Sequence, residues 1–114
     1  FSNLITVSKL DASETKSVSS MFSGCSKLTT LGGLENLGKA YLTTESANNK
    51  AYTLTLNESN NLTHDSLMNV INNLYDIATK GCNAQKLVLG STNMAKLTAE
   101  EIAIATNKGW TITG

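Results

Sequence analysis

The chain has 114 residues, enough for one domain with its own core and too few for two. Hydrophobic residues make up 40% of the chain and charged residues 16%, and nine basic residues balance nine acidic ones. Lysines are scattered singly and arginine is absent, which argues against nucleic-acid binding. No apolar run approaches the roughly 20 residues that a membrane-spanning helix needs. Because the chain begins with Phe1 rather than Met, we take it to be a fragment of a longer protein, with any targeting segment upstream.

Two segments in the N-terminal third of the chain are related. Residues Leu4–Leu10 align with Leu28–Leu34, and most matching positions are apolar, as in short strands with one face packed inward. A weaker helix is expected over residues 14–22, and a short helix followed by a polar loop over residues 37–50. Internal repetition of this kind indicates a repeat architecture.

A second set of related segments follows in the C-terminal half. The short strand pattern Thr53–Leu56 recurs at Lys86–Leu89, and again at Trp110–Thr113 with Ile112 in the place of Leu89. Each unit is expected to consist of a short strand, a turn and a helix. Such a unit cannot bury its apolar face alone, so neighbouring units must stack.

Two helices are expected between these strands. Thr63 is a suitable N-cap for the first helix, whose apolar face continues until Gly81 ends it. The second helix begins with a capping box formed by Thr98 and Glu101, and it ends at Lys108-Gly109.

Stacking these units predicts an α/β fold, namely a right-handed leucine-rich-repeat solenoid of about five strand–helix turns with a parallel strand ladder. The whole chain, residues 1–114, is expected to form this single domain. Trp110 is expected to cover the end of the solenoid core, because a terminal strand otherwise leaves an open apolar edge.

The stretch Met21–Leu28 resembles the MFxxCxxL signature of BspA-like leucine-rich repeats, which occur in bacterial surface proteins and phage-encoded proteins. Asn61–Leu67 together with Ile71–Leu74 resembles the longer helical repeats near the end of such arrays, and so do Leu87–Ser91, Leu97–Glu101 and Ala105–Trp110. The resemblance implies MFxxC-type repeats in residues 1–36, and longer helical repeats with a C-terminal cap in residues 52–114. It also implies that the aromatic and cysteine side chains of the signature pack under the following strand, and that the family shares no catalytic residues.

No catalytic residue, metal ligand or cofactor is expected. His64 is the sole histidine, which supports neither a Cys–His pair nor a zinc site, and we interpret it as a solvated residue in the first turn of a helix. Glu100 and Glu101 are adjacent on a helix and point in different directions. A disulfide between Cys25 and Cys82 is disfavoured, although whether both thiols are free stays open.

Asparagines are dense in the second half of the chain. Asn57, Asn60 and Asn93 are expected to bond the backbone of neighbouring turns, as inward asparagines do in leucine-rich repeats, and a polar surface for sugar binding is the alternative. Tyr41 and Tyr52 flank the polar loop and are the ligand-binding candidates, because Tyr is favoured at interface hot spots.

These features predict a non-catalytic extracellular recognition or adhesion module that binds a protein or glycan on a cell surface. The alternative is a structural spacer or docking domain in a larger assembly, such as a phage tail or baseplate appendage, where it contacts neighbouring subunits. The expected location is extracellular, at a cell surface or on a virion, and neither a cofactor nor a nucleic-acid partner is expected.

Overall fold

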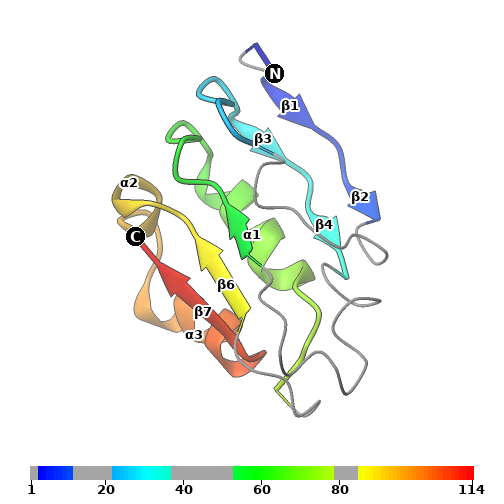
Figure 1. Ribbon diagram of the computed structural model, residues 1–114, viewed down its shortest axis with the longest axis vertical. Coiled ribbons are helices and arrows are strands. Elements are labelled where there is room, and N and C mark those ends of the chain that lie inside the picture. The colour runs from blue at the N-terminus through cyan, green and yellow to red at the C-terminus, as the bar shows by residue number, and fades with distance from the viewer. Residues whose placement is uncertain (1–2, 12–21, 37–52, 79–84) are drawn as a thin grey trace.

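The computed structural model describes residues 3–11, 22–36, 53–78 and 85–114 (Figure 1). The elements in chain order are β1 (Thr6–Val7), β2 (Leu10–Asp11), β3 (Thr30–Leu31), β4 (Leu34–Glu35), β5 (Thr53–Thr55), α1 (His64–Asn73), β6 (Gln85–Val88), α2 (Ser91–Met94), α3 (Ala99–Asn107) and β7 (Trp110–Thr113). Within these ranges the fold is a small α/β structure.

The described strands pair in parallel and form three small sheets, β1–β3, β2–β4 and β5–β6–β7. In the first sheet Thr6 lies opposite Thr30, which is the alignment expected from the sequence. In the third sheet Leu87 lies between Leu54 and Ile112. The expected match of Ile112 with Leu89 is therefore wrong by two positions, because it is Leu87 that pairs with Ile112.

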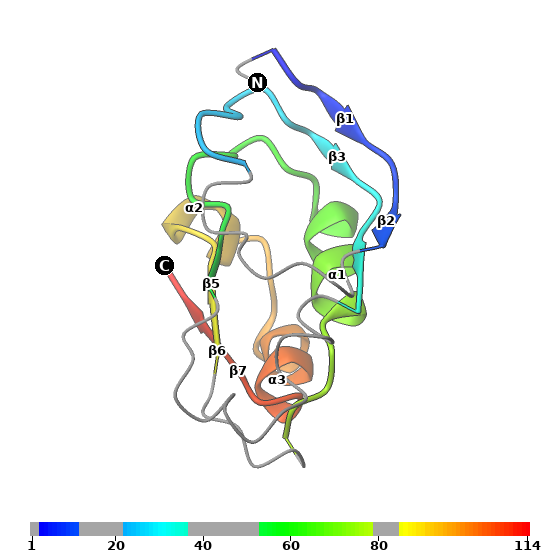
Figure 2. The same ribbon diagram turned by 45° about the vertical axis from the view of Figure 1, so that its right-hand side comes forward.

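The prediction of a leucine-rich-repeat solenoid of about five strand–helix turns is wrong, because the described strands do not form one continuous ladder. The strands β1 to β4 lie in one layer beside α1, which in turn packs against α3. The sheet β5–β6–β7 forms the other layer, and Figure 2 shows it nearly edge-on with α1 and α3 on one side. The related segments Leu4–Leu10 and Leu28–Leu34 thus belong to one layer, and the related strands β5, β6 and β7 belong to the other.

The physical reason for the interruption lies at the free edge of β3, which a helix occupies in place of a strand. The backbone nitrogen of Leu31 donates a hydrogen bond to Ser66 Oγ at 3.0 Å, and its carbonyl oxygen accepts one from Asn69 Nδ2 at 3.0 Å. The backbone nitrogen of Thr63 donates to the carbonyl oxygen of Thr29 at 3.0 Å. Side chains and the first turn of α1 therefore make the hydrogen bonds that the next strand of a ladder would have made.

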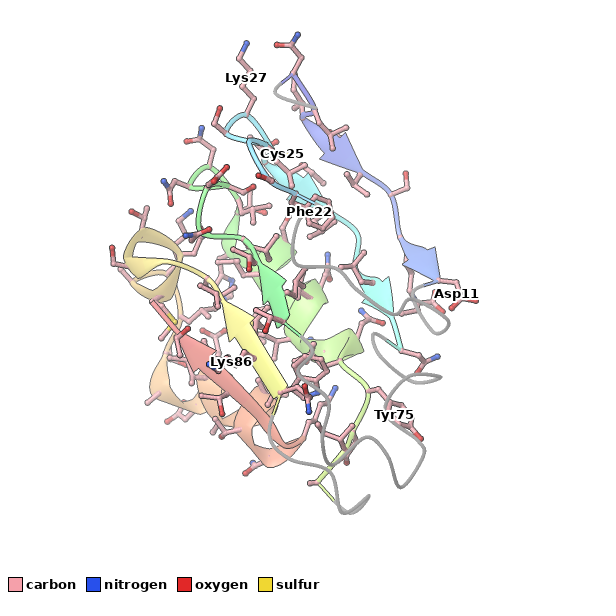
Figure 3. All side chains as sticks on the ribbon, in the orientation of Figure 1. Asp11, Phe22, Cys25, Lys27, Tyr75 and Lys86 are labelled. Atoms are coloured by element: carbon pink, nitrogen blue, oxygen red, sulfur yellow. The ribbon has the colours of Figure 1, made fainter. Side chains whose placement is uncertain are left out.

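The apolar core lies between the two layers. The leucines of β3, β4, β5 and β6 point into it, and its largest fully buried side chains are Trp110, Leu28, Leu31, Leu34, Leu54, Leu56, Leu62, Leu67 and Ile71. Phe22 and Cys25 are buried beside Leu28, as the resemblance implied, and Figure 3 shows both next to β3. Burial of this kind is the main favourable contribution to the stability of the fold.

The helix α1 ends at Asn73, earlier than the sequence predicts, because tertiary contacts hold the following residues in an extended conformation. Lys108 Nζ donates hydrogen bonds to the carbonyl oxygens of Ile71, Asn72 and Leu74, at 3.3, 2.7 and 3.2 Å. Carbonyls at a helix C-terminus lack the donors that one further turn would supply, and Lys108 takes that role here, although the carbonyl of Ile71 also accepts from the backbone nitrogen of Leu74 at 3.4 Å. The predicted stop at Gly81 lies outside the described residues, as do the helix expected over residues 14–22, apart from Phe22, and the loop expected over residues 37–50.

Candidate functional site

A half-open hollow lies on the surface between the turn that follows Phe22 and the end of β5. It has a volume of about 230 Å³, and its lining residues are Phe22, Ser23, Thr55, Asn57 and Glu58. Two segments that are distant in sequence therefore build its walls. Because Thr55 is the last residue of β5, the hollow borders the face of the β5–β6–β7 sheet that points away from α1 and α3 (Figure 2).

Hydrogen bonds between the two turns hold the walls of the hollow in place. The backbone nitrogen of Gly24 donates to a carboxylate oxygen of Glu58, Oε2. The hydroxyl of Ser59 donates to the carbonyl oxygen of Cys25 at 2.9 Å, and Asn61 Nδ2 donates to the carbonyl oxygen of Ser26 at 2.9 Å. Gly24 has a φ of 75°, a conformation that glycine adopts without steric cost.

The lining of the hollow is mostly polar. Ser23, Asn57 and Glu58 are exposed, Thr55 is half-buried, and Phe22 is 3% exposed, so its ring offers only a small apolar area. Among the described residues, nothing bonds the side-chain amide of Asn57 or the second carboxylate oxygen of Glu58. Together these groups offer both donors and acceptors to a small polar molecule.

A second polar cluster joins the first turns of α1 and α3. His64 Nε2 lies 2.6 Å from Glu101 Oε2, and His64 Nδ1 lies 3.3 Å from Asp65 Oδ1. The hydrogen bond with Glu101 raises the pKa of His64, and Asp65 raises it further. The backbone hydrogen bond from Thr98 lowers the pKa of Glu101, and His64 adds to the effect.

The interpretation of His64 as a solvated residue in the first turn of a helix is confirmed, because it is the exposed first residue of α1. Its side chain is 46% exposed, so solvent reaches it, but it bridges two helix N-termini. Glu101 makes the predicted capping box with Thr98 at the same time, and Thr63 is the N-cap of α1 as predicted. Because Glu101 bonds both His64 and the backbone of Thr98, the cluster connects α1 to α3.

The asparagines divide between structural and exposed positions. Asn93 is fully buried, and its Nδ2 donates to the carbonyl oxygens of Leu56, Ser59 and Leu89 at 3.2, 3.1 and 3.0 Å. The prediction of a backbone-bonding role is therefore confirmed for Asn93. It is wrong for Asn57 and Asn60, whose side chains are exposed and make no hydrogen bond to described residues.

Tyr41 and Tyr52, the ligand-binding residues expected from the sequence, lie outside the described residues, as does Cys82. Cys25 is a free and buried thiol. The sequence did not single out Ser23, Thr55 or Glu58. Their only signal was weak: Glu58 lies in a polar turn just after the last leucine of a strand, where ligand-contacting residues are common.

In the described part of the chain, no group of three or more His, Cys, Asp or Glu side chains is arranged to hold a metal ion. Similarly, no helix within those ranges is long and apolar enough to cross a membrane. No family model, curated protein or solved structure matches the chain. The candidate function must therefore be argued from the surface itself.

Proposed function

We propose that the chain is a non-catalytic recognition module that binds a protein or a glycan at a cell surface. The observation that carries the proposal is the outer face of the β5–β6–β7 sheet, which continues at Thr55 into the polar hollow. The side chains on this face are Thr53, Thr55, Lys86, Val88, Thr111 and Thr113, and all are exposed or half-exposed. Figure 3 shows Lys86 in the middle of the sheet.

This face suits binding because its side chains are held in register. Parallel pairing places Thr53, Lys86 and Thr111 in one row across the sheet, and Thr55, Val88 and Thr113 in the next. Threonine is stiff at χ1, so ordering its side chain against a partner costs little conformational entropy. The helices α1 and α3 lie on the opposite side of the sheet, and no described element covers the outer face (Figure 2).

A binding role rather than catalysis is supported by how the ionisable groups are used. Lys96 Nζ donates to the carbonyl oxygens of Asn60 and Leu62 at 2.8 and 2.6 Å, and burial lowers the pKa of this lysine. Lys108 Nζ donates to carbonyl oxygens at the end of α1, and Glu101 forms the capping box of α3 with Thr98. These groups stabilise the fold and are not arranged around a shared reaction centre.

The resemblance of Met21–Leu28 to the BspA-like signature supports the same class of function, and from it we propose a role outside the cell, on a bacterial surface or a virion. The alternative is a docking domain in a larger assembly. One observation favours it: Ile5 beside β1 is 55% exposed, which suits contact with a neighbouring subunit.

The test is binding of a tagged copy of the chain to bacterial cells, bacterial glycans and host matrix proteins. Saturable binding to one class, lost in Thr111→Glu and retained in Thr106→Glu, is the expected result. Thr106 is a matched control because it is exposed on α3, in the other layer. If a folded sample binds nothing in the panel, the recognition role is wrong and the docking alternative takes its place.

A further inference from the structure

We propose that the hollow lined by Phe22, Ser23, Thr55, Asn57 and Glu58 is a subsite for one neutral sugar ring, a hexopyranose with free neighbouring hydroxyls. The inference rests on the proposed recognition function and names its ligand as a glycan. It concerns a site distinct from the outer face of the sheet, although Thr55 belongs to both.

The size of the hollow favours a single ring. Its volume of about 230 Å³ is smaller than the roughly 300–1,000 Å³ of pockets that enclose drug-sized ligands. A hollow of this size that is open on one side accommodates one unit of a chain and leaves the neighbouring units in solvent. Those units would extend towards the outer face of the sheet, because Thr55 forms the shared border.

The chemistry of the lining favours hydroxyl groups. A sugar hydroxyl is both a donor and an acceptor, and so are the Ser23 and Thr55 hydroxyls. The Asn57 amide donates and accepts through separate atoms, and the second oxygen of Glu58 accepts. No described partner competes for the Asn57 amide or for that oxygen of Glu58, so both are available to a ligand.

The charge of the lining selects among sugars. Among the described residues of the lining Glu58 alone is ionisable, and its carboxylate repels the carboxylates of uronic and sialic acids. A neutral ring avoids this repulsion and satisfies the carboxylate by hydrogen bonding. The site therefore discriminates against acidic glycans.

A peptide side chain fits the hollow less well than a sugar. Protein hot spots fill pockets with aromatic or aliphatic anchors that become fully desolvated. Phe22 is 3% exposed and the remaining lining is polar, so an apolar anchor would bury little apolar surface. The observations thus favour a glycan over a protein at this site.

The walls are organised before a ligand arrives. Three hydrogen bonds join the two turns: from the backbone of Gly24 to Glu58, from Ser59 to the backbone of Cys25, and from Asn61 to the backbone of Ser26. A ligand therefore does not need to order the walls, which lowers the entropic cost of binding. A single ring makes few contacts, so we expect a dissociation constant in the millimolar range, corresponding to roughly −4 kcal/mol at 1 mM.

The test is a titration of the ¹⁵N-labelled chain with glucose, galactose, mannose and N-acetylglucosamine, followed through backbone amide shifts. Glucuronic acid and methylamine serve as the acidic and cationic probes. The expected result is a saturable shift of the Gly24, Thr55 and Asn57 amides with at least one neutral sugar. Glucuronic acid is expected to bind at least tenfold more weakly.

The variants Asn57→Ala and Asn60→Ala form a matched pair. Both asparagines are exposed in the same turn and neither side chain bonds a described residue, but only Asn57 lines the hollow. Asn57→Ala is expected to weaken sugar binding at least fivefold, and Asn60→Ala to leave it unchanged. The amide spectra of both variants show whether the fold is intact.

Three results would overturn the proposal: no saturable shift with any neutral sugar, equal weakening by the two variants, or methylamine binding more tightly than every sugar. Failure of the subsite is distinguishable from failure of the recognition function. If panel binding remains and is lost in Thr111→Glu, the module recognises its partner through the sheet face alone. If panel binding also fails, both proposals are wrong.

Discussion

Replacement of Asn93 tests whether one buried amide ties the units of the C-terminal half together. The side chain is fully buried, and its Nδ2 donates to the carbonyl oxygens of Leu56, Ser59 and Leu89. Its Oδ1 accepts a hydrogen bond from Lys96 Nζ at 3.0 Å. Removal of the amide therefore leaves acceptors from two successive turns without their donor.

The expected magnitude follows from the number of hydrogens. The amide has two N–H groups, so the three carbonyls share the equivalent of two full hydrogen bonds. Leaving a buried polar group unsatisfied costs roughly 1–3 kcal/mol, so Asn93→Ala is expected to lower the free energy of unfolding by about 3 kcal/mol. For a domain of this size such a loss lowers the melting temperature by about 12 °C.

The variant Asn93→Asp separates hydrogen bonding from volume, because the two side chains have the same shape. One carboxylate oxygen would keep the hydrogen bond from Lys96 Nζ, which favours the charged form, but the other would lie against three carbonyl oxygens that cannot donate to it. Full burial and the contact with these carbonyls outweigh the single lysine, so the folded state favours the protonated form and raises the pKa of the aspartic acid. The stability of this variant is therefore greatest below the ordinary value of about 3.9 and falls as pH rises through the raised value. At neutral pH it is expected to be at least as unstable as Asn93→Ala.

Urea denaturation followed by circular dichroism provides the measurement, with Asn60→Ala as the exposed control. The control is expected to change the free energy of unfolding by less than about 0.5 kcal/mol. If Asn93→Ala costs less than about 1 kcal/mol more than the control, the amide does not hold the turns together and the reasoning is refuted.

Three further predictions concern other contacts. The pKa of His64 is raised and that of Glu101 is lowered, so their pairing stabilises the fold most between pH 4.5 and 6.5, where both groups are charged. The variant His64→Gln is therefore expected to lower the melting temperature most in this window and less at higher pH. A loss that does not depend on pH would contradict this. Gly33→Ala is expected to lower the free energy of unfolding by about 2 kcal/mol or more, because φ is 114° and the new Cβ would lie 2.7 Å from a side-chain nitrogen of α1. Gly24 has a φ of 75° and open space around it, so Gly24→Ala is expected to cost about 1 kcal/mol in the same denaturation assay. Equal losses in the two variants would refute the packing argument. Lys108→Met is expected to lower the free energy of unfolding by about 1–2 kcal/mol and to increase amide hydrogen exchange at the end of α1. Unchanged exchange there would show that the lysine does not stabilise the helix end.

Local features of the fold were predictable from the sequence. The capping box of Thr98 and Glu101 and the N-cap at Thr63 depend on residues within one turn, so the sequence alone specifies them. The alternation of strand leucines predicted which side chains are buried, and the alignment of Thr53–Leu56 with Lys86–Leu89 predicted a strand register. These signals depend on neighbouring residues or on a pattern repeated in the sequence, so they do not depend on how the layers are arranged.

The candidate site was only partly predictable. Asn57 was named as a backbone-bonding residue with a sugar-binding surface as the alternative, and the structure places it in the wall of the hollow. Nothing in the sequence indicated that Ser23 and Glu58 lie beside it. They meet because Gly24 bonds Glu58 across two turns distant in the chain.

Residues that are close together in the chain specify the short elements, their N-caps and the apolar positions that form the core. The layering of these elements depends on contacts between residues that are distant in the chain. Ser66 and Asn69 of α1 bond the edge of β3, so a helix continues the layer where a strand was expected. Lys108 bonds the carbonyls at the end of α1, so the helix ends at Asn73 although the apolar pattern continues. Both outcomes depend on which donors reach which backbone groups in space, and the spacing of residues along the chain does not contain that information.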